Sequence, residues 1–118
     1  MMETMVQNST NPLEDPMDER ERKYLEMVSQ FPESPLGHFS LGRYYVELGR
    51  FQDASVLLTR ALEGEPDWTA ALVSLADARG GLGDLPGAIE LLERAARTRC
   101  HGGIRREIDT RLANLRNS

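Results

Sequence analysis

The chain has 118 residues, of which 40% are hydrophobic and 28% charged, and its formal net charge is −5. This length and composition predict one globular domain. The acidic balance argues against a duplex-binding protein, which usually carries a basic surface, and against docking on an anionic membrane. The single cysteine leaves no partner for an intrachain disulfide.

The sequence also lacks the signals of membrane insertion and secretion. No apolar run approaches the roughly 18 residues that a spanning helix needs. The first residues have neither the basic flank nor the apolar stretch of a secretory signal. We therefore expect a cytoplasmic protein with no membrane partner.

The chain is predicted to begin with a tail and one helix. Residues 1–14 are mostly polar, and we expect them to form a disordered tail. A first helix is predicted over residues 15–31, because Asp15 is a good N-cap and Pro16 is tolerated at the first helical position. Its apolar stripe consists of Tyr24, Leu25, Met27, Val28 and Phe31.

Two further helices follow in the next third of the chain. The second helix is predicted from the similar start signal Ser34-Pro35 to about Leu48. Gly49 is expected to end it in the left-handed conformation. The third helix is predicted from about Phe51 to Glu63.

The last part of the chain is predicted to hold three helices. Asp67 is expected to cap the fourth, over residues 68–82, and Asp84 to cap the fifth, over residues 85–98. A Gly-rich loop then leads to a sixth helix over residues 104–115. Connections this short make consecutive helices antiparallel neighbours.

An internal repeat of 34 residues relates the two central helix pairs. Nine positions are identical at this offset: Ser40/Ser74, Leu41/Leu75, Leu48/Leu82, Gly49/Gly83, Ala54/Ala88, Leu57/Leu91, Leu58/Leu92, Arg60/Arg94 and Ala61/Ala95. Most of them are small or apolar and are spaced as on a helix. Such repeats stack on their neighbours, because one helix pair cannot bury its apolar face alone.

The repeat resembles the tetratricopeptide repeat family. The first copy carries the motif Leu41-Gly42-Arg43-Tyr44-Tyr45, followed by Ala54, Leu58, Ala61 and Pro66. The second copy departs from the motif, with Arg79 in place of Tyr and Cys100 in place of Pro. The resemblance implies an all-α fold of about six helices, a short right-handed stack of antiparallel helix pairs forming an α-solenoid.

The resemblance also divides the chain. Within a domain over residues 15–118, it implies a half-repeat helix at 15–31, repeats at 35–68 and 69–102, and a capping helix at 103–116. The last helix fits the apolar pattern only if its register shifts by one residue, since Asp109 and Thr110 otherwise fall where Leu75 and Ala76 lie.

The predicted core combines small residues with larger apolar ones. Small residues are expected where helices cross closely, at Gly42, Ala54, Ala61, Ala76, Ala88 and Ala95. Larger side chains are expected to fill the gaps between helices, at Tyr45, Leu48, Phe51, Leu58, Leu75, Leu82, Leu85 and Leu92.

Few residues suggest chemistry. We interpret His38 as a packing residue, and Cys100-His101 lacks the further ligands that a zinc site needs. We therefore predict no metal, no cofactor and no catalytic residues. Five arginines gather late in the chain, at 94, 97, 99, 105 and 106. Two interpretations remain open: they complement helix ends, or they form a basic patch.

The resemblance implies a binding surface on the first helix of each pair, lining a concave groove. By position, its residues are Leu36, Phe39, Arg43, Val46, Glu47, Ala70, Val73 and Asp77, extended by Gly80 and Gly81. Arg43 and Asp77 are placed to pair across the groove, or Arg43 is left to meet a partner's carboxylate.

These residues lead to two functional hypotheses. The first is a non-enzymatic adaptor, scaffold or chaperone-like module that binds a peptide or helix of another protein in the groove. The alternative is a homodimer that buries the same apolar face. Nucleic acid is not an expected partner.

Overall fold

The structure, a computed structural model, describes residues 15–117, so the predicted tail at residues 1–14 lies outside it. The described part folds into helices alone: α2 (Asp15–Gln30), α3 (Pro35–Glu47), α4 (Phe51–Gly64), α5 (Thr69–Gly81), α6 (Leu85–Ala96) and α7 (Gly102–Arg116). The all-α prediction is confirmed.

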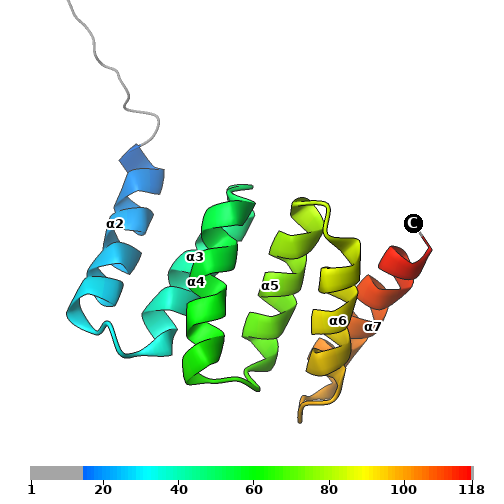
Figure 1. Cartoon of the computed structure of the whole chain (residues 1–118). Helices are drawn as coiled ribbons and strands as arrows, with labels where there is room; N and C mark the ends of the chain where they lie inside the picture. Colours follow the sequence, from blue (N-terminus) through cyan, green and yellow to red (C-terminus); the bar gives the residue numbers. More distant parts are fainter. Residues whose placement is uncertain (1–14, 118) are drawn as a thin grey trace, which may run out of the picture.

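The helices form a stack of antiparallel pairs. They follow one another across Figure 1 from α2 to α7, each running opposite to its neighbour. The most extensive packing is between α3 and α4 and between α5 and α6. The two copies of the 34-residue repeat are therefore the two central helix pairs.

Most helix ends follow the local signals in the sequence. The Ser34 side chain accepts a hydrogen bond from the backbone N–H of Leu36 at 3.3 Å. Asp84 accepts one from the N–H of Gly87 at 3.0 Å. Gly49 and Gly83 have φ angles of 78° and 86°, which the left-handed helix stop requires.

The predicted cap of α5 is wrong. The N-cap residue is Trp68 rather than Asp67, and no side-chain hydrogen bond caps this helix. The reason is packing: the Trp68 ring lies 4.4 Å from the Phe39 ring, centroid to centroid. This aromatic contact holds the turn against α3, so the position of the helix start does not depend on the Asp67 carboxylate.

Small residues let the helices approach closely, as predicted. Ala54, Ala61, Ala88 and Ala95 are fully buried. A Cβ added to Gly42 would lie only 2.8 Å from Cγ of Leu58. The largest fully buried side chains are Leu41, Leu58, Leu72, Leu92 and Ile108.

Two predicted core positions are exposed instead. Leu82 and Leu85 lie beside the turn between α5 and α6, and 44% and 36% of their surfaces are exposed. The equivalent residues of the first repeat, Leu48 and Phe51, pack against the core because a further helix pair follows them. Only α7 follows α6 in the described chain. Two residues of the predicted apolar stripe are also exposed, Leu25 on α2 and Phe31 directly after its end, since α3 covers one side of this first helix.

Helix α7 closes the stack with one apolar face. Ile108 and Leu112 are buried against the core, whereas Asp109 and Thr110 are exposed. Arg116 forms an ion pair with Glu93 of α6 at 2.7 Å. The outer side of α7 is thus polar, as a terminal element of a helical stack requires. None of the described helices is long and apolar enough to cross a membrane.

Candidate protein-binding groove

The first helices of the two pairs and the last helix together line a groove of about 360 Å³. Helices α3, α5 and α7 each contribute side chains to it. Its lining residues are Phe39, Arg43, Val46, Glu47, Ala70, Val73, Ser74, Asp77, Ile104, Glu107 and Arg111. We call this surface the concave groove.

Seven of the eight predicted site residues lie along the concave groove. They are Phe39, Arg43, Val46, Glu47, Ala70, Val73 and Asp77. The eighth, Leu36, lies at the start of α3 outside the lining, and 51% of its surface is exposed. The spacing of the repeat thus brings the predicted residues together on one surface. Their role in binding a partner is a proposal.

The apolar residues of the groove differ in how freely they can be contacted. Val73 is only 7% exposed and belongs to the core. Phe39 is partly buried against Trp68. Phe39, Val46 and Ala70 all keep intermediate exposure. The accessible apolar surface of the groove therefore includes these three residues, beside the nearly buried Val73.

The charged residues of the groove are mostly paired with one another. Arg111 donates from Nε and a terminal nitrogen to the two carboxylate oxygens of Asp77, at 2.9 and 3.1 Å. These hydrogen bonds raise the pKa of the Arg111 guanidinium above its ordinary value. The predicted pair of Arg43 with Asp77 is wrong, because α7 supplies the arginine instead.

Arg43 is left with its donors unused. It is exposed, and it has no hydrogen bond or ion pair within residues 15–117. Its neighbour in the groove, Glu47, lies 3.8 Å from Arg20 of α2. Glu107 lies 3.4 Å from Arg111. The guanidinium of Arg43 is therefore available to an acidic group from outside.

Sequence reasoning missed the contribution of α7 to the groove. Ile104, Glu107 and Arg111 follow Ala70, Val73 and Asp77 by 34 residues. The same offset that revealed the repeat would have found them. They were overlooked because the apolar stripe of α7 suggests a register shifted by one residue.

The extension of the groove to Gly81 is also wrong. A Cβ added to Gly81 would overlap the ring of Phe51 on α4. This glycine therefore faces the second helix of the first pair, not the groove. Gly80 has open space at the position of an added Cβ and is not among the residues that line the groove either.

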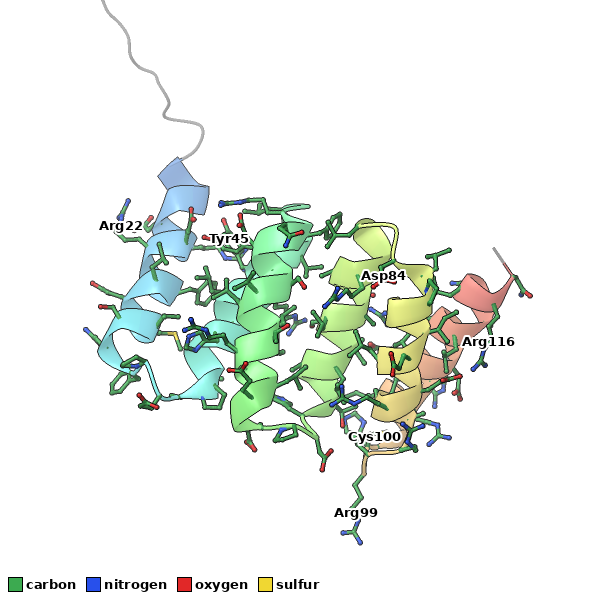
Figure 2. All side chains as sticks on the ribbon, viewed as in Figure 1. Arg22, Tyr45, Asp84, Arg99, Cys100 and Arg116 are labelled. Carbon is green, nitrogen blue, oxygen red and sulfur yellow. The ribbon has the colours of Figure 1, made fainter. Side chains whose placement is uncertain are left out.

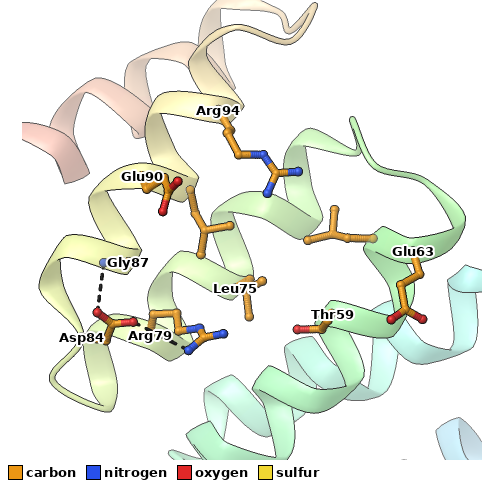
Figure 3. A pocket seen from close by; sticks show the side chains of 10 residues that line it. Thr59, Glu63, Leu75, Arg79, Asp84, Gly87, Glu90 and Arg94 are labelled. Carbon is orange, nitrogen blue, oxygen red and sulfur yellow. Dashed lines mark hydrogen bonds and ion pairs between the residues drawn. The ribbon is translucent and has the colours of Figure 1, made fainter.

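A second hollow lies on the opposite side of α5, between α4 and α6 (Figure 3). It encloses about 420 Å³ over a floor that includes the buried Leu75. Arg79 and Asp84 close one end with an ion pair of 3.7 Å, and Asp84 also caps α6. Both charged groups thus stabilise the turn between α5 and α6.

The histidine at the start of α3 is a packing residue, as predicted. His38 is 6% exposed, and its Nδ1 lies 3.3 Å from the carbonyl oxygen of Ser34. Across the described residues, no group of three or more His, Cys, Asp or Glu side chains is placed to hold a metal ion.

Comparisons with known proteins agree with this architecture. The family model described as tetratricopeptide repeat matches residues 45–99. A protein from Bordetella parapertussis with a known solution structure superposes with a TM-score of 0.70 and 28% sequence identity. The superposition covers 82% of this chain and 87% of that one. A search of the curated proteins finds no match.

Proposed function

Because the chain is a tetratricopeptide repeat protein, we propose that it binds a segment of a partner protein in the concave groove. Repeats of this family are protein-interaction modules. Within such a module, the proposed binding residues are the accessible ones on α3, α5 and α7. The module performs no chemistry on its partner.

The proposal rests on Arg43, whose exposed side chain leaves its hydrogen-bond donors unused. Arg43 lines the same groove as the partly exposed apolar residues Val46 and Ala70, and its guanidinium has no partner in the described structure. Arg43 makes no hydrogen bond or ion pair within the described residues, whereas the neighbouring charges are all paired. A partner segment with one carboxylate beside an apolar residue would satisfy both features.

The test compares two groove variants with the wild-type chain. Partners are first captured on immobilised wild-type protein and identified, and the candidate is then purified for calorimetric titration. Arg43→Ala removes the unused donors, and Ala70→Arg fills the groove. Both side chains are accessible, so the fold should tolerate both changes. We expect each variant to weaken binding at least about tenfold.

Matched controls carry the same changes outside the groove. Arg22→Ala removes an exposed arginine from α2, and Gln52→Arg adds one to the exposed start of α4. Both controls should bind as the wild type does. Equal affinities for groove and control variants would refute the proposal. Should the captured partner be a second copy of the chain, sedimentation will show a dimer and the homodimer alternative holds.

A further inference from the structure

The stack has two equivalent pockets along one edge, where the ends of the helix pairs meet. The first edge pocket, of about 570 Å³, is lined by Pro32, Glu33, Ser34, Pro35, His38, Arg60, Glu63 and Gly64. The second edge pocket, of about 480 Å³, is lined by Asp67, Leu72, Arg94, Arg97, Thr98 and Arg99. Five of the six residues that line the second pocket correspond to lining residues of the first at the offset of 34.

The correspondence shows which features belong to the fold. An acidic residue, Glu33 or Asp67, stands at the same place in both pockets, and so does an arginine, Arg60 or Arg94. The repeat therefore builds this pocket twice with one carboxylate and one guanidinium in common.

The remaining charges of the two pockets are opposite. Glu63 in the first edge pocket corresponds to Arg97 in the second, and Glu65 of the first repeat corresponds to Arg99. The first pocket thus carries an excess of negative charge. The second carries three arginines and one carboxylate, on a chain whose formal net charge is −5.

The arginines of the second edge pocket are hardly used by the fold. Arg97 and Arg99 are exposed and make no hydrogen bond or ion pair within the described chain. Figure 2 shows Arg99 pointing away from the helices. Arg94 makes one long contact, 3.5 Å, to the carbonyl oxygen of Pro66.

A helix-end role does not explain these arginines. Basic residues near a helix C-terminus complement its partial negative charge. On α6, Arg94 lies in the last turn and Arg97 is the C-cap. Yet α4, the equivalent helix of the first repeat, has no basic residue in its last turn and carries Glu63 at the position of Arg97. The fold thus forms this helix end without them.

We propose that the second edge pocket binds an acidic segment of a partner protein, through neighbouring carboxylates held by Arg97 and Arg99. Guanidinium groups match carboxylates with paired, charge-assisted hydrogen bonds. Arg94 lies at the same pocket and adds a third positive charge. This surface is separate from the concave groove, so the proposal stands independently of the groove's function.

The test uses a fluorescein-labelled hexaglutamate peptide as the probe and fluorescence anisotropy as the readout. The wild-type chain should bind it at low salt, and the affinity should fall as salt rises. Arg97→Glu/Arg99→Glu, which installs the residues of the first repeat, should weaken binding at least about tenfold. The helical circular dichroism spectrum should not change, because both side chains are exposed.

One control separates the pocket from net charge. Arg22→Glu/Lys23→Glu changes the charge equally on the exposed surface of α2. This variant should retain the wild-type affinity within about twofold. If it loses as much affinity as the pocket variant, the proposed location is wrong.

A gain-of-binding variant makes the test two-sided. Glu63→Arg/Glu65→Arg gives the first edge pocket the charges of the second, and should raise the number of bound peptides from about one to about two. An unchanged stoichiometry would contradict the proposal.

Two other results would assign the pocket to a different occupant. Tighter binding of a single-stranded oligouridylate than of hexaglutamate would assign it to nucleic acid, and a dimer at low salt would assign it to a second copy of the chain.

Discussion

Arg111 of α7 binds both carboxylate oxygens of Asp77 of α5, and the two residues lie 34 positions apart. The contact joins equivalent positions of successive repeat units across the concave groove. It fixes the last helix at the correct distance for Ile104 and Glu107 to complete the lining. The groove therefore has three helical walls rather than two.

We predict that Arg111→Ala loosens α7. The pair is about one-third exposed, so solvent screens it, and the expected loss of unfolding free energy is about 1 kcal/mol. Amide hydrogen exchange should accelerate in α7 more than in α4. Arg106→Ala removes an exposed arginine of the same helix and should leave exchange unchanged; equal effects would show that the pair does not hold α7.

A second prediction concerns two adjacent glycines. Gly81→Ala places a methyl group into the ring of Phe51 and should cost about 1–3 kcal/mol of stability. Gly80→Ala meets open space within the same helix, and should be neutral or stabilise by up to about 1 kcal/mol. Urea unfolding measures both. Two similar values would mean that the α4–α5 contact at Phe51 is looser than described.

The two predicted helix caps give a third pair of variants. Asp84→Ala removes the hydrogen bond to Gly87 and should cost about 1 kcal/mol. Asp67→Ala removes no capping bond, because Trp68 is the N-cap of α5, and its effect should stay within about 0.5 kcal/mol. Thermal unfolding would contradict this account if the Asp67 variant were the less stable one.

The raised pKa of Tyr45 predicts how the free energy of unfolding changes with pH in the alkaline range. Burial, together with the hydrogen bond that its hydroxyl donates to Glu21, raises the pKa of Tyr45 from 10.0 to about 12. The unfolded chain thus loses this proton first as pH rises. The stabilisation is complete below pH 10 and falls between about pH 10 and 12, by about 1–2 kcal/mol.

This prediction is tested with Tyr45→Phe. The variant should lose less stability than the wild type over that pH range, measured by urea unfolding at several pH values. Absorbance titration of tyrosinate should also lose the transition near pH 12. The chain has three tyrosines, so one transition is assignable by its absence. A wild-type curve that runs parallel to the variant's would exclude the role of Tyr45.

The sequence was sufficient to predict the helices and most of the residues that line the concave groove. Local chemistry determines the ends at Gly49, Gly83 and Asp84, because each signal acts within a few residues. The repeat spacing then places Arg43, Val46 and Ala70 on one side of the stack.

The rest depended on contacts that a local pattern does not contain. Trp68 replaced Asp67 at a helix start because its ring packs on Phe39, 29 positions earlier in the sequence. Leu82 and Leu85 are exposed because only α7 follows α6 among the described residues. The partner of Asp77 was missed because it comes from α7. The residues of α7 that line the groove keep the offset of 34, whereas its apolar stripe suggests an offset shifted by one residue.

The central claim is that the concave groove binds a partner segment, and mapping of amide chemical shifts on the labelled chain tests it most directly. Addition of the captured partner should move the signals of Arg43, Val46, Ala70 and Ile104, on α3, α5 and α7. Signals of Val56 and Thr59, on α4, should stay in place. Shifts concentrated on α4 and α6, with none along α3, would contradict the account.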